Sequence, residues 1–178
     1  MRFLLILVAL ATLTACTDAR STTTPPRAVE PMPLIGEFRA ESDTARISTG
    51  NVSIERGGLL FDKGVVLFTR TLEPRRGENL IARDGDSYAA VAVGPAELTI
   101  ELRRVTQQSL SGGAVGLCNG APPTYVALAY QERATAITLL VFSGDEPPGP
   151  AATQSRVCAT YGYVAPNGAR TRQGVVLQ

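Results

Sequence analysis

Apolar and polar side chains alternate at every second position over much of this chain, which is the period of a β-strand. The alternation is clearest in ELTIELRRV, residues 97–105. There Leu98, Ile100 and Leu102 would form the core face of a strand. The solvent face would carry Glu97, Thr99, Glu101 and Arg103.

Further short apolar runs predict more strands of the same kind, separated by turn signals such as Gly57-Gly58 and Asp84-Gly85. These runs are residues 34–40, 51–56, 59–61, 65–72, 80–83, 87–93, 125–130, 136–142 and 157–164. Short strands at regular spacing with Gly-rich turns are typical of antiparallel barrels and sandwiches. The sequence therefore predicts an all-β fold, a small antiparallel β-barrel or sandwich of about 8 to 9 short strands.

Two runs do not alternate. KGVVLF, residues 63–68, is continuously apolar and predicts a strand that is buried on both faces. PPTYVALAYQER, residues 122–133, has apolar residues at helical spacing but is rich in residues that favour strands. We expect a strand there, with a helix as the alternative.

The first residues form a segment of another kind. Arg2 is followed by an apolar run, Phe3–Leu13, and then by small residues, which is the pattern of a secretory signal peptide. The apolar run is too short to cross a bilayer, which needs roughly 20 such residues. We expect residues 1–15 to be removed.

Leu13, Thr14, Ala15 and Cys16 match the lipobox at the end of bacterial lipoprotein signals. The leader therefore resembles those of bacterial lipoproteins, and the resemblance implies that Cys16 becomes the lipidated amino terminus. Thr17, not Asp, follows this cysteine, which favours the periplasmic face of the outer membrane over the inner membrane. The implied partner is a membrane, held through the lipid anchor.

The domain boundaries follow from this leader and from composition. Residues 16–33 hold the lipidated cysteine and a Thr- and Pro-rich tether, whose 17 residues after Cys16 could reach about 50 Å. Residues 34–165 form the β domain. Residues 166–178 are a C-terminal tail or a final short strand.

Cys118 and Cys158 are the remaining cysteines. In an exported protein such a pair predicts a disulfide. It would close a loop of about 40 residues and stabilise the fold by roughly 4 kcal/mol in the chain-entropy model.

Charge and residue types exclude several functions. Without Arg2 the chain carries 16 basic and 16 acidic residues, so no basic field favours nucleic acid. The sequence has no histidine and no G-x-S-x-G motif, so we expect no catalytic triad, metal site or cofactor. Carboxylate catalysis stays open as an alternative, although Glu97 and Glu101 would lie about 13 Å apart along one strand.

Two loops are candidate binding surfaces, because function in β domains often lies on loops of a rigid scaffold. Residues 144–155 are Pro-rich and acidic, with Asp145 and Glu146, and Arg156 follows them. Residues 106–116 precede Cys118. The alternative is that both loops are long and merely held in place by the disulfide.

Two resemblances concern the β domain itself. LIGEF, residues 34–38, is similar to the first strand of lipocalins, with Gly36 matched and Phe38 in place of their Trp. Ser143-Gly144 is similar to the Ser-Gly loop of small periplasmic lysozyme inhibitors, although Asp145 departs from that pattern. Three hypotheses follow: a non-catalytic lipoprotein that binds an envelope protein or glycan, a lipocalin-like carrier of an apolar ligand, and a carboxylate-based envelope hydrolase.

Overall fold

The computed structural model of the chain describes residues 33–166, 169–170 and 176–177. The predicted signal peptide, Cys16, residues 17–32 of the predicted tether and most of the predicted tail lie outside the described residues. In the described part of the chain, no helix combines the length and the apolar character needed to cross a bilayer.

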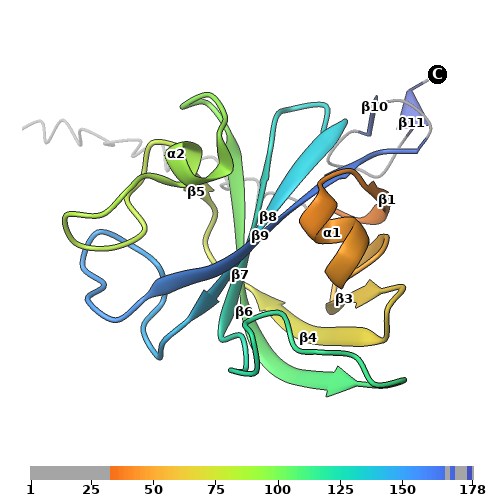
Figure 1. Cartoon of the computed structure of the whole chain (residues 1–178). Coiled ribbons are helices and arrows are strands. Elements are labelled where there is room, and N and C mark those ends of the chain that lie inside the picture. The colour runs from red at the N-terminus through yellow and green to blue at the C-terminus, as the bar shows by residue number, and fades with distance from the viewer. Residues whose placement is uncertain (1–32, 167–168, 171–175, 178) are drawn as a thin grey trace, which may run out of the picture. The chain divides into compact units, whose positions relative to one another are not determined.

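Strands are the main regular structure of the described chain (Figure 1). The main strands are β1 (Gly36–Ala40), β2 (Val52–Glu55), β3 (Gly58–Phe61), β4 (Val65–Thr71), β5 (Arg75–Arg76), β6 (Thr99–Leu110), β7 (Tyr125–Tyr130), β8 (Ala136–Ser143) and β9 (Arg156–Val164). Two short helices are α1 (Asp43–Ser48) and α2 (Tyr88–Ala92). A separate two-stranded pairing joins β10 (Ala169–Arg170) and β11 (Val176–Leu177).

The main sheet closes on itself. Its strand order is β4-β3-β2-β1-β9-β8-β7-β6-β5, and β4 also pairs with β6. This second pairing makes a closed antiparallel barrel of eight strands, with β5 added beside the first residues of β6. The all-β prediction is confirmed, and the architecture is a barrel, which leaves no long unpaired edge.

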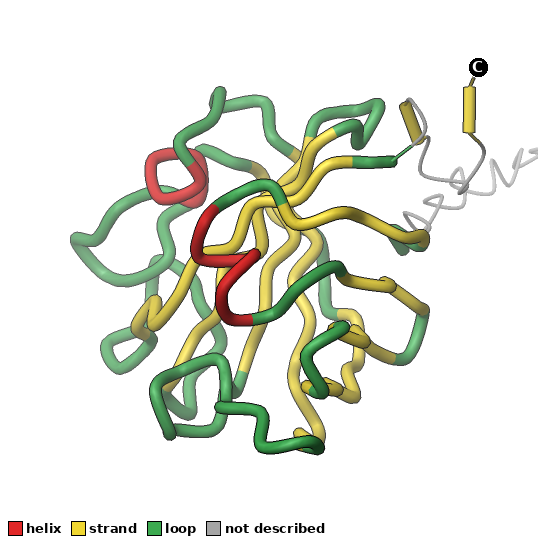
Figure 2. The backbone as a smooth tube through the Cα atoms, turned by 45° about the vertical axis from the view of Figure 1, so that its right-hand side comes forward, coloured by secondary structure: helices red, strands yellow, loops and turns green. Residues whose placement is uncertain are grey.

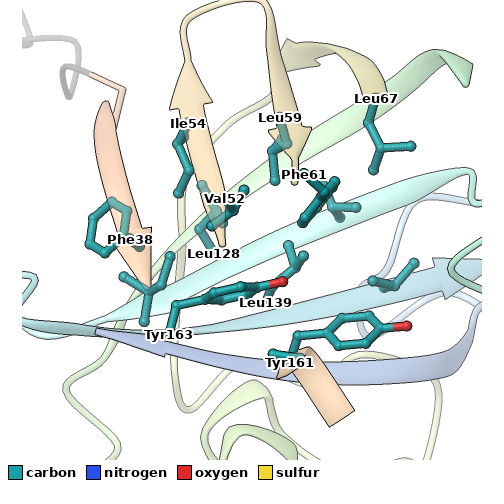
Figure 3. Packing of buried hydrophobic residues seen from close by; sticks show 14 of the residues in the cluster. Phe38, Val52, Ile54, Leu59, Phe61, Leu67, Leu128, Leu139, Tyr161 and Tyr163 are labelled. Atoms are coloured by element: carbon teal, nitrogen blue, oxygen red, sulfur yellow. The ribbon is translucent and has the colours of Figure 1, made fainter. Parts of the chain in front are cut away.

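Apolar side chains of β1–β4 and β7–β9 meet inside the barrel (Figure 3). Phe38, Leu128 and Tyr163 are each at most 1% exposed. Burying one large apolar side chain contributes about 1.5–3 kcal/mol, so this interior core is a main source of stability.

A second apolar core lies on the outer face of β6, β7 and β8. Ile100, Ala127 and Leu140 from these strands pack with Tyr88 of α2. The segment between β5 and β6 therefore covers this face, and β7 is buried on both sides. The strand prediction for residues 125–130 is confirmed, and this double burial explains why its sequence does not alternate.

The same second core overturns the orientation predicted for residues 97–105. Ile100 and Leu102 do lie in a core, but it is the outer one. Glu101 and Arg103 point into the barrel and are buried, at 5% and 0% exposure. The face that we predicted to be solvated is an interior face, because charged side chains can be buried when they are paired.

The prediction that residues 63–68 form a strand buried on both faces is also wrong. These residues form most of β4, but burial alternates along it: Val65 and Leu67 are fully buried, whereas Phe68 is 45% exposed. No second core covers the outer face of β4 here, so the apolar run is half solvated.

Helical segments were the main errors in secondary structure. Residues 87–93, predicted as a strand, form α2, where the Ser87 side chain caps the helix by accepting a hydrogen bond from Ala90 N (3.2 Å). Residues 80–83 form turns, with one isolated bridge between Leu80 and Ser87. Figure 2 shows both helices as short segments in connections between strands. The other helix, α1, was not predicted, although Ser42 caps it in the same way.

Candidate binding surface at one end of the barrel

The two ends of the barrel differ in how they are closed. At the end that we call the entry end, the chain enters at Leu34 and the β2–β3 turn lies at Arg56–Gly57. At the opposite end, the loop end, lie α1, the β3–β4 turn, the β6–β7 connection and the β8–β9 connection. Antiparallel pairing sorts the connections in this way, because neighbouring strands run in opposite directions.

An open groove of about 760 Å³ lies at the loop end. It runs between the end of α1, the β3–β4 turn and the β6–β7 connection. Its lining residues are 47–48, 62–64, 111–117, 119 and 161. A groove of this size falls in the range of ligand sites, about 300–1,000 Å³.

Hydrogen bonds hold one wall of the groove to the other. Ser111 N donates to Gly64 O (2.9 Å), and Lys63 Nζ donates to Ile47 O (2.6 Å). Gly64 has φ of +82°, and a Cβ there would lie 2.5 Å from Ser111 O, so only glycine fits this approach. The turn, the helix end and the connection are therefore fixed relative to one another.

The disulfide anchors the far side of the groove. Cys118 and Cys158 are joined, with their Cα atoms 5.2 Å apart, which confirms the predicted bridge. Tyr161 OH donates to Leu117 O (3.2 Å) beside it, and burial raises the pKa of this hydroxyl. Gly112 and Gly113, both at positive φ, lie in the part of the connection that these contacts leave open.

Two apolar side chains project from the groove walls into solvent. Ile47 is 74% exposed and Val115 is 72% exposed. Both side chains belong to the lining of the groove, so a molecule bound there could bury them. We predicted residues 106–116 as a candidate binding loop. Residues 106–110 belong to β6 instead, and of this range only residues 111–116 line the groove.

In the acidic loop, residues 144–155, polar side chains bind the backbone of the loop itself. The Glu146 carboxylate accepts hydrogen bonds from Thr153 N (2.6 Å) and Gln154 N (3.2 Å), and these bonds lower its pKa. Arg156 Nη1 donates to Thr153 O (3.0 Å). Glu146 and Arg156 thus both bind the backbone of Thr153, and the side chains of Arg156 and Asp145 are exposed.

The acidic loop also packs against the segment that covers the second core. Gly149 N donates to Ile81 O (3.0 Å), and Tyr88 OH donates to Pro148 O (3.2 Å). The loop is therefore a folded cover of that core, and its sequence, rich in Pro and Gly, fits a shape held by backbone contacts.

The entry end is closed by a buried ion pair. Arg103 donates to Glu101 Oε1 from Nε (2.7 Å) and lies 2.6 Å from it at Nη2. Arg103 also donates to Leu34 O (2.9 Å) and Glu55 O (2.5 Å), and Glu101 Oε2 accepts from Leu34 N (2.6 Å). The alternation of polar and apolar residues could not predict this network, because the network buries two charged side chains in the interior.

Among residues 33–166, 169–170 and 176–177, no three His, Cys, Asp or Glu side chains gather as a metal site. Glu101, one of the two carboxylates considered above, is bound to Arg103 and to Leu34 N, while Glu97 is exposed. No family model, no curated protein and no solved structure matches this chain.

Proposed function

We propose that this protein is a lipid-anchored lipoprotein of the bacterial envelope whose β-barrel is a non-catalytic binding domain. The groove at the loop end is its binding surface, and the partner is an envelope protein or glycan on the periplasmic side of the outer membrane. The observation that carries the proposal is the groove itself, with Ile47 and Val115 exposed on walls held by hydrogen bonds and a disulfide. A rigid site loses little conformational entropy when it binds.

The filled barrel interior favours this function over a lipocalin-like carrier. Phe38, Leu128 and Tyr163 occupy the space that a carried apolar ligand would need. A hydrolase is disfavoured because the sequence has no histidine and because Glu101 is committed to an ion pair.

Site-specific photocrosslinking in intact cells tests the binding surface. A photoreactive residue at position 115 should give discrete protein or glycan adducts. Replacing Ile47 with Ser should weaken them with less than about 0.5 kcal/mol change in stability, because the side chain is exposed. Val93→Ser is the matched control, because Val93 is an apolar residue that is 92% exposed outside the groove.

The outcomes separate the hypotheses. Adducts that are lost in Ile47→Ser and kept in Val93→Ser support the groove. No adduct from position 115, or equal adducts in both variants, would remove it as the binding surface. Asp145→Ala tests the acidic loop without disturbing the backbone contacts of Glu146, and reduced capture would add that loop to the surface.

The lipid anchor is tested separately. Cys16→Ala should abolish incorporation of labelled palmitate and leave an uncleaved precursor. Equal labelling of this variant and the wild type would overturn the anchor.

A further inference from the structure

Two arginines face each other on the outside of the barrel near the entry end. Arg70 on β4 lies directly opposite Arg104 on β6 in the antiparallel register. Directly opposite residues point to the same side of the sheet, and both of these are exposed. Like charges in this position destabilise a sheet, so folding alone gives no reason for the pair.

Among the residues that the structure describes, no acidic side chain forms an ion pair with either arginine. The ion pairs of the described residues are Arg46–Asp43, Arg75–Glu73, Arg76–Glu78 and Arg103–Glu101. Glu73, three residues after Arg70, is thus directed to Arg75 (3.6 Å). Arg56 in the nearby β2–β3 turn is also exposed, and Gly57 O in that turn accepts from Thr69 N (2.7 Å). Arg70 and Arg104 therefore have no ion-pair partner among the described residues, while the exposed Glu55 lies on the same outer face, across Gly58 from Phe68.

An exposed aromatic ring adjoins the arginines. Phe68 precedes Arg70 by two residues, so both project from the same face of β4, and it is 45% exposed. Its neighbour on β3 is Gly58, which has no side chain to cover the ring. Leu60, 40% exposed, continues the apolar part of this face. We call Phe68, Arg70 and Arg104 the arginine face.

The arginine face lies at the end where the chain enters the barrel. Arg104 follows Arg103, whose guanidinium holds Leu34 O at 2.9 Å. The 17 residues between Cys16 and Leu34 could span about 50 Å, so a lipid on Cys16 keeps this end within reach of the membrane.

We propose that the arginine face is a docking surface for an anionic lipid bilayer. Guanidinium groups bind phosphate oxygens through paired hydrogen bonds, and an adjoining aromatic ring can enter the headgroup region. Docking there places the outer wall of the barrel at β4 and β6 against the membrane. The inference uses the proposed lipid anchor only for its reach, because the charge and the ring are properties of the barrel.

Vesicle binding tests the inference without the lipid anchor. The chain from Thr17 to Gln178 keeps the whole barrel and its two cores but lacks Cys16, so it is not acylated. It should sediment with vesicles that contain about one-third phosphatidylglycerol and not with pure phosphatidylcholine. Binding should fall as salt is added, because screening shortens the range of the attraction.

A charge-matched pair of variants locates the contact. Arg70→Gln with Arg104→Gln should weaken partitioning about 25-fold, about fivefold for each arginine near an anionic surface. Arg46→Gln with Arg156→Gln removes the same charge from the loop end and should leave partitioning within about twofold of wild type. Phe68→Ser should weaken binding at high salt as well as low, because its contribution is apolar.

Several results would overturn the inference. These are equal binding to neutral vesicles, equal loss in the two double variants, and full competition by millimolar inorganic phosphate, which would indicate an anion pocket. Retention on polyglutamate without vesicle binding would assign the face to an acidic protein. The chain used for vesicle binding is not acylated. A negative vesicle result therefore does not bear on the lipid anchor, and a negative palmitate result at Cys16 does not bear on vesicle binding.

Discussion

The two ends of this barrel are closed by different physical means. At the entry end, a buried ion pair between Glu101 and Arg103 fills the interior and holds the main chain of Leu34. At the loop end, a disulfide and backbone hydrogen bonds hold the connections, and a groove stays open between them. The first arrangement occupies its polar groups completely. The second leaves side chains such as Val115 exposed beside the groove, which is why we place the binding surface there.

The largest effect is expected from breaking the ion pair at the entry end. Arg103→Ala should lower the free energy of unfolding by about 3–5 kcal/mol, because it leaves the Glu101 carboxylate buried without its partner. Urea unfolding monitored by circular dichroism measures the change.

A control variant separates the charge from the packing. Glu101→Gln with Arg103→Met removes both charges, and the Gln oxygen still accepts from Leu34 N. It should be less destabilising than Arg103→Ala alone. Equal losses in the two variants would show that the ion pair is not what closes this end.

The disulfide at the loop end should give the next effect. Cys118→Ala with Cys158→Ala should lower the free energy of unfolding by about 2–5 kcal/mol, because the unfolded chain loses a constraint. The reduced constraint should also expose residues 111–117 to proteases before the barrel unfolds. Thiol labelling of the denatured, unreduced wild type is the companion measurement, and a labelled Cys118 there would contradict the bridge.

A smaller loss of stability is expected from removing the hydroxyl of a buried tyrosine in either core. Tyr163 OH lies 2.7 Å from Thr49 Oγ1 in the interior core, and Tyr88 OH donates to Pro148 O in the second. Replacing either with Phe should cost about 1 kcal/mol for the lost hydrogen bond. A loss for Tyr88→Phe that is no larger than for an exposed residue would argue against the second core.

The same tyrosines predict alkaline instability. Burial raises the pKa of Tyr88 to about 12 and raises that of Tyr163 further, both from 10.0. Folding therefore favours the protonated hydroxyls. Their contribution is fully present below pH 10 and is lost as the pH rises toward 12 and above. Thermal melts between pH 9 and 12 should show falling midpoints, and the slope should be shallower in Tyr163→Phe.

The smallest effect is local to the acidic loop. Hydrogen bonds from Thr153 N and Gln154 N lower the pKa of Glu146 below 4.5, so its contribution is present above that pH and is lost as the pH falls through the lowered value. The protection factors for hydrogen exchange of residues 144–155 should fall in acid and, in Glu146→Gln, already at neutral pH. Asp145→Asn is the control and should behave like the wild type.

The local sequence pattern predicted the fold class correctly. It did not predict which face of each strand is buried. Alternation and Gly-rich turns predicted most barrel strands, and the expected export together with an even cysteine pair predicted the disulfide. The orientation of β6 could not be predicted, because a second core on the outer side of Ile100 inverts the usual relation between polarity and exposure. The helix at residues 88–92 begins at Ser87, a cap signal that the β-branched Val91 and Val93 concealed.

The candidate site likewise contains residues that the sequence pattern identified and residues that it did not. Residues 111–116 and Cys118 stood out in the sequence, because loops before a disulfide are visible as composition. Ile47 and Lys63 did not, because they join the groove only when the barrel brings α1 to the β3–β4 turn. Contacts between residues far apart in sequence are set by closure of the sheet, which no local pattern contains.

The most direct test of the two-ended account is photocrosslinking in intact cells from two positions in parallel. A photoreactive residue at position 115 reports on the groove, and one at position 68 reports on the arginine face. The account predicts protein or glycan adducts from position 115 and lipid adducts from position 68. The same adducts from both positions, or lipid adducts from position 115 alone, would contradict it.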